Sequence, residues 1–495
     1  MARLKFTLLH SINKVKAMNT PFAFRLLDLP NELVSTIIEH VESVAILKTL
    51  CRTCRRLQYL TEPVLYRYAL IRTGVETEFI HGAITHHTRG RDRAAALEKI
   101  DIPCHPRFHQ NFQEVARILA AVSNLKELMI ESPECNTSDF ESEAEWQQMV
   151  GSLFRPFRDA LSGIITERLP LQKLQKLTLH INGSDSPYWT LDQWSVCLFL
   201  LPSLVFLKVS CINLLHDIPG GPTSKAICPL RHLELEEANI THTGLRYILG
   251  LPRALEILYL GENCYNIRHF GEEVDPTSNH LFTSDSAASV EALKQQSHSL
   301  KQLTYATTDK YYQHRQRRLT NRNKGPTDAG FADFHCLESV TLIGYCPNFE
   351  RAIMSSRSPP ILKNLTFKSD NAFRPGSYGE AESTFSMIPF LRAPSSSVPP
   401  TLANLNVVYH NPPLSPQDLT PSTRIFIETA AKATGKVGIN LRVLSEDRTN
   451  YFPPYLYGEP TPEEHVVYDG DFTQSFASIG AKASSRVILW GPIED

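Results

Sequence analysis

Residues 230–249 of the chain, LRHLELEEANITHTGLRYIL, combine a strand, a turn and a helix in one short unit. Leu230, Leu233 and Leu235 follow the order L-x-x-L-x-L, which puts Leu233 and Leu235 on one face of a strand. The end of the stretch, GLRYIL, carries apolar residues at helical spacing. The unit therefore predicts a short buried strand followed by a helix that packs against it.

The same strand pattern recurs along the chain. With Φ for any apolar residue, the order L-x-x-Φ-x-Φ occurs at 97–102, 125–130, 174–179, 204–209, 230–235, 255–260, 300–305, 337–342, 362–367 and 402–407. A buried helix can carry one such motif by chance, but ten in series are typical of repeats. Because the short strands alternate with helical stretches, the sequence predicts an α/β fold with a parallel sheet and helices outside it.

Two of these stretches carry more of a known repeat signature. In 230–249 the strand is followed by Asn239, and in 255–264 it is followed by Asn263. An Asn side chain can satisfy backbone groups that a tight turn leaves unpaired. These stretches resemble leucine-rich repeats. The resemblance implies an irregular leucine-rich-repeat solenoid over 91–445, with parallel strands inside, helices outside, and inserted loops near 307–327 and 370–400.

A different pattern occupies residues 27–66, LDLPNELVSTIIEHVESVAILKTLCRTCRRLQYLTEPVLY. Pro30 stands where a helix would start, a position that tolerates the missing amide hydrogen. Leu33, Ile37 and Val41 then recur every four residues, and two further apolar sets follow. Three short helices of this length bury only a small core. We therefore expect part of this apolar surface to contact another chain.

The order of these residues is similar to an F-box. It runs Leu29-Pro30-x-Glu32-Leu33-x-x-x-Ile37, then Ile46-Leu47-x-x-Leu50-Cys51-x-x-Cys54-Arg55-Arg56-Leu57, then Pro63-Val64-Leu65-Tyr66. F-box proteins are substrate receptors of SCF-type cullin–RING ubiquitin ligases. The resemblance implies a three-helix F-box over 25–72 that binds a Skp-type adaptor and, through it, a cullin scaffold. The alternative is an ordinary three-helix cap of a solenoid.

The resemblance also implies which residues contact the adaptor. They are Leu27, Leu29, Pro30, Leu33, Ile37, Leu47, Leu50, Leu57, Val64 and Leu65.

The rest of the chain is predicted to connect the two modules or to extend from them. Residues 1–24 are expected to be a disordered lead-in, and residues 73–90 a linker. A Pro-rich acidic tail is expected over 446–495, with a last strand at 486–490.

Composition excludes several classes of partner. The formal net charge is −2 over 495 residues, so no overall basic bias attracts nucleic acid or an anionic membrane. No apolar stretch is long enough for a membrane-spanning helix.

The ten cysteines are scattered along the chain, which indicates reduced thiols rather than a disulfide framework. We therefore expect an intracellular protein of the cytoplasm, the nucleus or both.

The sequence lacks four common motifs of enzyme sites. It contains no phosphate-binding loop, dinucleotide-binding turn, nucleophile elbow or zinc-protease helix, so we expect no catalytic residue and no cofactor. Cys51-x-x-Cys54 has the spacing of half a zinc site, for which Cys104, His105 and His109 would be further ligands. Because no second pair stands at ligand spacing, buried thiols are the favoured interpretation and no metal is expected.

A basic run lies at 310–324, KYYQHRQRRLTNRNK. Aromatic residues beside arginines can bind RNA, and such a cluster can serve in nuclear import or bind an acidic segment. A solvated inserted loop is the interpretation that charge runs favour, so nucleic acid is not an expected partner.

The residues between the core positions of each strand point to the opposite face of the sheet. In three neighbouring repeats they include Lys208, His232, Glu234, Ile257 and Tyr259. Exposed aromatic and charged residues in adjacent strands suit a protein epitope, so these five are candidates for contact with a substrate. A polar surface without a ligand is the alternative.

Taken with the two resemblances, the sequence predicts the substrate-recognition subunit of an SCF-type ubiquitin ligase. The F-box would bind the adaptor, the repeats would bind the substrate protein, and other subunits would carry out the chemistry. The alternative is a repeat-domain interaction scaffold that joins no ligase. An RNA-binding or enzymatic role rests only on the basic run.

Overall fold

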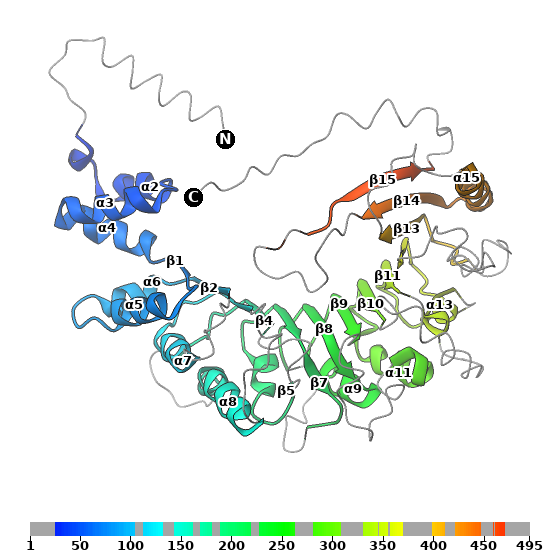
Figure 1. Cartoon of the computed structure of the whole chain (residues 1–495), viewed down its shortest axis with the longest axis horizontal. Coiled ribbons are helices and arrows are strands. Elements are labelled where there is room, and N and C mark those ends of the chain that lie inside the picture. Colours follow the sequence, from blue (N-terminus) through cyan, green and yellow to red (C-terminus); the bar gives the residue numbers. More distant parts are fainter. Residues whose placement is uncertain are drawn as a thin grey trace, which may run out of the picture. The chain divides into compact units, whose positions relative to one another are not determined.

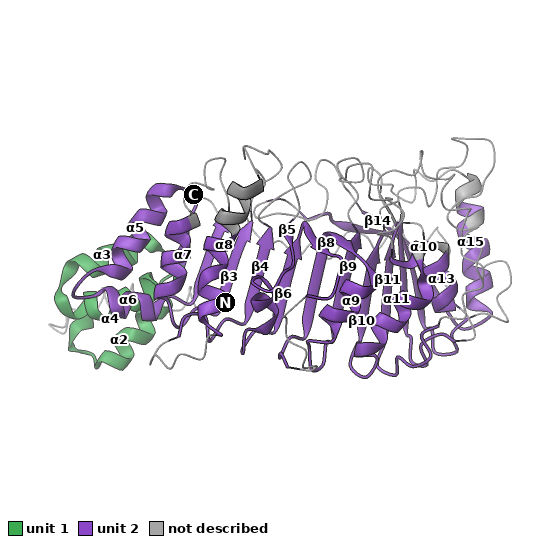
Figure 2. Cartoon of the chain, turned by 90° about the horizontal axis from the view of Figure 1, so that it is seen from below, with its two compact units in different colours: residues 1–68 green, residues 69–495 purple. Residues whose placement is uncertain are grey.

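The structure is a computed structural model of the chain. It describes residues 25–103, 112–131, 143–161, 169–180, 189–218, 227–262, 281–307, 330–344, 346–354, 357–369, 398–410, 421–446, 459 and 461–470. The chain divides into two compact units, Met1–Tyr68 (unit 1) and Ala69–Asp495 (unit 2), coloured separately in Figure 2.

Unit 1 consists, in its described part, of a short 3-10 turn and three α-helices. They are η1 (Leu26–Asp28), α2 (Asn31–Glu39), α3 (Val44–Thr53) and α4 (Arg55–Leu65). Pro30 is the N-cap residue of α2, at the helix start that the sequence indicated. Helix α3 begins after Ser43, whose hydroxyl accepts a hydrogen bond from the Ile46 amide at 3.4 Å.

The core of unit 1 is small. Its fully buried apolar side chains are Val34, Ile38, Leu47 and Leu57. The Arg56 guanidinium links α4 to the start of α2 and to the residues before it. It donates hydrogen bonds to Asn31 Oδ1 at 2.9 Å and to the Leu29 carbonyl at 2.5 Å. A core of this size leaves other apolar side chains of the three helices at the surface.

Unit 2 is an α/β structure built on one large, mostly parallel sheet of 15 strands. In sheet order the strands are β1 (Tyr68–Leu70), β2 (Lys99–Pro103), β3 (Glu127–Glu131), β4 (Lys176–His180), β6 (Phe206–Ser210), β8 (His232–Ile240), β9 (Ile257–Glu262), β10 (Gln302–Ala306), β11 (Ser339–Ile343), β12 (Asn364–Ser369), β13 (Asn404–His410), β14 (Asn440–Glu446) and β15 (Glu464–Asp469). The short strands β5 (Trp189–Thr190) and β7 (Ile212–Leu214) pair with each other, and β7 also pairs with β8. From β2 to β14 neighbouring strands run parallel, and β15 pairs antiparallel with β14.

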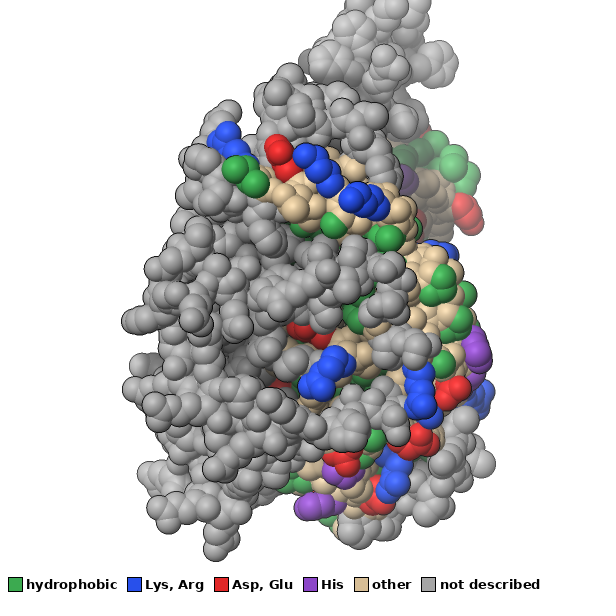
Figure 3. Space-filling model, turned by 90° about the vertical axis from the view of Figure 1, so that its right-hand side faces the viewer, with side chains coloured by type: hydrophobic (Ala, Val, Ile, Leu, Met, Phe, Trp, Pro, Cys, Tyr) green, Lys and Arg blue, Asp and Glu red, His purple; other side chains and the backbone are tan. Residues whose placement is uncertain are grey.

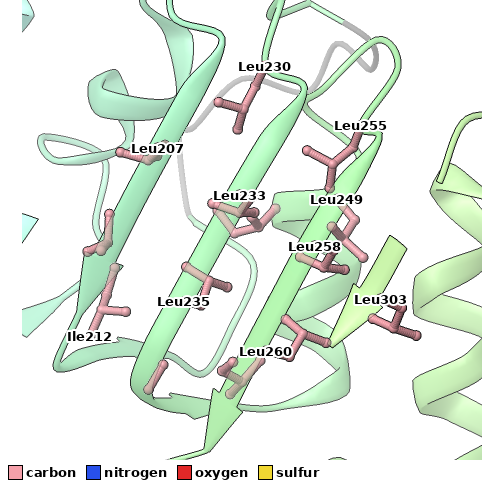
Figure 4. Close-up of a cluster of buried hydrophobic side chains, with 14 of the residues drawn as sticks. Leu207, Ile212, Leu230, Leu233, Leu235, Leu249, Leu255, Leu258, Leu260 and Leu303 are labelled. Atoms are coloured by element: carbon pink, nitrogen blue, oxygen red, sulfur yellow. The ribbon is translucent and has the colours of Figure 1, made fainter. Parts of the chain in front are cut away.

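All ten L-x-x-Φ-x-Φ motifs lie in parallel strands and share one register. Their second apolar positions face each other along the sheet, in the order Ile100, Leu128, Leu177, Leu207, Leu233, Leu258, Leu303, Val340, Leu365 and Leu405, and the row continues to Leu441. Every residue of this row is buried. Figure 4 shows Leu233 and Leu235 on β8 beside Leu258 and Leu260 on β9 within the same apolar cluster.

Helices line one side of this sheet. The described helices of unit 2 are α5 (Gly74–Thr85), α6 (Gly90–Ala96), α7 (Phe112–Ala121), α8 (Glu143–Asp159), η4 (Val196–Leu200), α9 (His242–Leu249), α10 (Leu281–Ser284), α11 (Ser286–Leu293), η6 (Lys294–Gln296), α13 (Pro347–Met354) and α15 (Pro421–Gly435). In Figure 1, α7, α8, α9, α11 and α13 follow the sheet along one side. Their buried side chains join those of the strands in one continuous apolar cluster, so the core lies between sheet and helices.

An aromatic cluster fills the core around α13. The ring of Phe349 lies 4.6 Å from that of Phe282 and 5.0 Å from that of Tyr305, measured between ring centroids. The next residue, Glu350, is also buried, and this burial raises the pKa of its carboxyl to about 8, against a partial opposing effect of Arg351. The folded chain therefore keeps Glu350 protonated at neutral pH.

We expect Glu350→Gln to stabilise unit 2 more at pH 7 than at pH 5. The folded pKa lies above the ordinary value of 4.5, so unfolding releases a proton and the free energy of unfolding falls as the pH rises from 4.5 to about 8. One pKa unit corresponds to about 1.4 kcal/mol, so the gain should differ by ~2–3 kcal/mol between the two pH values. Urea unfolding of both proteins measures it, with Glu338→Gln as the control for loss of an exposed carboxylate. An equal gain at both pH values would contradict the protonated state.

Two of the expected boundaries are wrong. Residues 73–90, expected as a linker, contain α5 and lead into α6. Thr73 and Glu76 form a capping box at the start of α5, and Ala83 and Ile84 near its end are buried. The sheet also begins at β1, before the predicted start at residue 91.

The C-terminal end differs as well. Part of the expected acidic tail is strand β15, in which Val467 and Tyr468 are buried and Asp469 pairs with Arg442 at 3.3 Å. The strand expected at 486–490, the lead-in 1–24 and most of the two inserted loops lie outside the described residues.

Candidate functional site

The face of the sheet opposite the core leucines, here called the polar face, carries the candidate residues. Phe206 and Lys208 on β6 align with His232 and Glu234 on β8. These two align in turn with Ile257 and Tyr259 on β9. All five predicted substrate-facing residues, Lys208, His232, Glu234, Ile257 and Tyr259, therefore lie on three adjacent strands, and each is partly exposed.

Glu234 links two of its neighbours. Its Oε1 lies 2.7 Å from His232 Nε2, and its Oε2 lies 3.8 Å from the Lys208 ammonium. The same ammonium lies 3.0 Å from an oxygen of Glu236, which follows Glu234 by two residues on β8. These charged side chains therefore form one connected group on the polar face.

The electrostatics of this group favour the charged forms of Lys208 and Glu234. Burial alone would lower the pKa of Lys208, but the nearby carboxylates of Glu236, Glu234 and Glu131 raise it above its ordinary value. Burial alone would raise the pKa of Glu234, but the hydrogen bond with His232 and the charge of Lys208 lower it. At neutral pH the polar face therefore presents the Lys208 ammonium beside the ionised Glu234 carboxylate.

Phe206 belongs to the same site and was not among the predicted residues. Its ring lies 4.5 Å from the ring of His232, and the Lys176 ammonium lies 5.0 Å from its centroid. The signal was present in the sequence, because Phe206 stands at the same motif position as His232 and Ile257.

A buried histidine lies beside this group, on β4. His180 Nδ1 forms a hydrogen bond with Ser210 Oγ, and its Nε2 has no hydrogen-bond partner among the described residues. Burial, with a smaller contribution from Lys208, lowers the pKa of His180 to about 3. In the folded chain the ring therefore remains uncharged even at pH values well below 7.

We expect His180→Asn to reduce the loss of unfolding free energy that the chain undergoes as the pH falls. The unfolded chain takes up a proton at His180 below pH 6.5, whereas the folded chain does so only near pH 3, so stability is lost as the pH falls through this range. Between pH 7 and pH 5 the wild-type free energy of unfolding should fall by ~2 kcal/mol more than that of the variant. Urea unfolding at both pH values measures the difference, and parallel pH profiles would contradict it.

Charge is unevenly distributed over the polar face. From β2 to β8 the described carboxylates are Asp101, Glu127, Glu131, Glu234 and Glu236, and the lysines are Lys99, Lys176 and Lys208. From β10 to β13 the two corresponding rows hold Gln302, Thr304, Ser339, Thr341, Asn364, Thr366, Asn404 and Asn406. These amides and hydroxyls bond to one another, as in the 2.9 Å bond from Asn404 Nδ2 to Asn364 Oδ1. In these two rows the strands from β10 to β13 are therefore neutral, and charge returns with Lys368 on β12, in the next row, and with Arg442 on β14.

The last strands carry ion pairs rather than a patch of one sign. Lys368 on β12 lies 3.4 Å from Glu446 and 2.9 Å from Glu464. Figure 3 shows acidic and basic side chains next to one another on the described part of the face that it presents.

The described part of the chain contains no group of three His, Cys, Asp or Glu side chains placed to hold a metal ion. Cys51 and Cys54 are partly buried in unit 1, where Cys54 packs against the core. Cys104, His105 and His109 lie outside the described residues, as does the basic run 310–324. None of the described helices is long and apolar enough to cross a membrane.

Unit 1 exposes apolar side chains on α2 and before it. Leu27 is 43 % exposed, Leu33 is 52 % exposed and Ile37 is 43 % exposed. Pro30 is also exposed. Of the other predicted adaptor-binding residues, those that are partly buried against the core are Leu29, Leu50, Val64 and Leu65.

Two of the predicted adaptor-binding residues, Leu47 and Leu57, do not lie at the surface of unit 1. Both are core residues of unit 1, at 5 % and 3 % exposure, so they support the fold and do not form part of its surface. The apolar spacing of a helix does not itself say which of two apolar sides is turned inward.

A comparison of the sequence with models of protein families finds no match, and a comparison with curated proteins finds none either.

Proposed function

We propose that the chain is the substrate-recognition subunit of an SCF-type cullin–RING ubiquitin ligase. Unit 1 would be an F-box that binds a Skp-type adaptor, and unit 2 would be an irregular leucine-rich-repeat solenoid that binds a substrate protein. The chain would contribute proximity and orientation to the transfer of ubiquitin, and the chemistry would belong to other subunits.

The observation that carries the proposal is the exposed apolar surface of unit 1. Leu33 and Ile37 lie one helical turn apart on α2, and each exposes more than two fifths of its side chain. Neighbouring exposed apolar side chains on a small helical unit mark a contact with another protein. The motif order that resembles an F-box uses these same residues as contacts.

Unit 2 supports the second half of the proposal. Ten strand motifs in one register are the arrangement that stacked repeats produce, since each repeat buries its apolar face against the next. Such sheets present one long face to a partner, and here that face is the polar face.

The direct test is binding between the purified full-length chain and a purified Skp-type adaptor. We expect a stable complex in size-exclusion chromatography, and its co-elution with a cullin when the scaffold is added. Binding of the adaptor without the cullin would favour the alternative, an interaction scaffold outside a ligase. No binding of the adaptor would refute the proposal.

A further inference from the structure

Three apolar side chains, Phe206, Ile257 and Tyr259, lie on β6 and β9 of the polar face, beside the charged residues of β8. Phe206 aligns with His232, which aligns with Ile257, and Tyr259 aligns with Glu234. All are partly exposed. An apolar surface flanked by fixed charge can select a ligand both by its apolar contact and by its sign.

The fixed charge next to these side chains is predominantly negative. Lys208 lies between Glu236, at 3.0 Å, and Glu234, at 3.8 Å. Glu131 adds to this field, since it too acts on Lys208. Lys176 is the other described cation here, and its ammonium lies over the ring of Phe206. Three carboxylates thus stand against two lysines.

We infer that this patch binds a protein segment in which a Lys or Arg side chain stands next to an apolar one. The inference rests on the proposed function, because it names the class of substrate for the same face. The cationic head would reach Glu234, with the buried Glu236 adding its negative charge, and its aliphatic stem and apolar neighbour would cover Phe206 and Tyr259.

The neutral strands next to the patch make this choice sharper. Gln302, Thr304, Ser339 and Thr341, on the two strands after β9, carry no charge. Among the described residues around Tyr259, a charged side chain of the partner therefore meets a complementary group towards β8 and β6 and not towards β10 and β11. An acidic side chain placed there would face the excess of carboxylates, and repulsion between like charges suppresses such a partner.

The test uses the purified full-length chain and three fluorescent peptides of equal length. Their centres read Leu-Arg-Leu-Lys, Leu-Glu-Leu-Glu and Ser-Arg-Ser-Lys between identical Gly-Ser flanks. Measured by fluorescence anisotropy, the first should bind at least about tenfold more tightly than either other peptide, which corresponds to ~1.4 kcal/mol. Its affinity should fall as the salt concentration rises.

Variants locate the binding on the patch. Glu234→Gln combined with Glu236→Gln should weaken binding of the first peptide about tenfold. The matched control is Glu338→Gln, which removes an exposed carboxylate that also pairs with a lysine, Lys363, at 3.0 Å. Because Glu236 is buried and its change could disturb folding, Glu234→Lys alone serves as a second variant and should reverse the preference towards the acidic peptide.

Equal binding of the basic and acidic peptides would overturn the inference, and so would absence of binding of the first peptide. Unchanged affinity in both the Gln variant and the Glu234→Lys variant would overturn it as well. Capture of the Skp-type adaptor is measured on the same preparation. If the adaptor binds and the peptide preference is absent, only this inference fails, whereas the reverse result refutes the ligase role and leaves the patch.

Discussion

Replacement of Leu33 and Ile37 together by Ala is expected to weaken capture of a Skp-type adaptor at least about 100-fold. Burial of one such side chain at an interface contributes about 1.5–3 kcal/mol, and each 1.4 kcal/mol is a factor of ten in affinity. Both side chains are exposed in unit 1, so the free chain should lose little stability. The dissociation constant, measured by calorimetry with the purified adaptor, tests the effect.

The chain offers a matched control. Val75 and Phe79 form another pair one helical turn apart, on α5, and they are 75 % and 65 % exposed. Their double replacement by Ala removes similar apolar surface from unit 2. We expect it to leave the affinity for the adaptor unchanged, and an equal loss in both variants would show that general apolar adhesion, not an F-box surface, captures the adaptor.

Leu33 and Ile37 are better positions for this experiment than Leu29 and Pro30. Leu29 and Pro30 are the most recognisable residues of the motif, yet Leu29 is partly buried and its carbonyl binds Arg56. Pro30 caps α2. Changes at these two residues would mix a folding defect with a binding defect, which Leu33 and Ile37 avoid.

The parallel sheet could be predicted because its determinants are local. In a strand the side chains alternate, so the spacing of Leu233 and Leu235 already defines one buried face. The same spacing at Leu258 and Leu260 then aligns the two strands without further information. Within the aligned row of parallel strands that runs from β2 to β14, the pattern missed β14, since Gly438 stands where the other repeats have their first Leu.

The remaining features depend on contacts that spacing does not report. Leu47 and Ile46 are neighbours on α3 with equal apolar character, but only Leu47 is buried, because the packing of α4 decides which side turns inward. β15 joins the edge of β14 in the antiparallel sense, a pairing that the spacing of the repeats does not report. The link between Glu234 and Lys208 likewise required the register of two strands separated by an undescribed stretch.

Replacement by Ala of two neighbouring residues on β9, one on each face of the sheet, should have very different effects on the free energy of unfolding. Leu258 is buried in the core and Ile257, its neighbour in sequence, is partly exposed on the polar face. Leu258→Ala should cost ~2–5 kcal/mol of unfolding free energy, because the cavity between sheet and helices cannot collapse fully. Ile257→Ala removes a side chain of the same size and should cost ~1 kcal/mol or less.

The pair is a sensitive test because side chains in a strand alternate with a period of two. A slip of one residue in the register would exchange the environments of Leu258 and Ile257, and would do the same for Leu233 and His232 on β8. Urea unfolding of both variants measures the free energies, and the same comparison of Leu233→Ala with His232→Ala repeats the test on the neighbouring strand. Equal costs within either pair would contradict the register, and a larger cost at Ile257 would reverse the assignment of core and polar face.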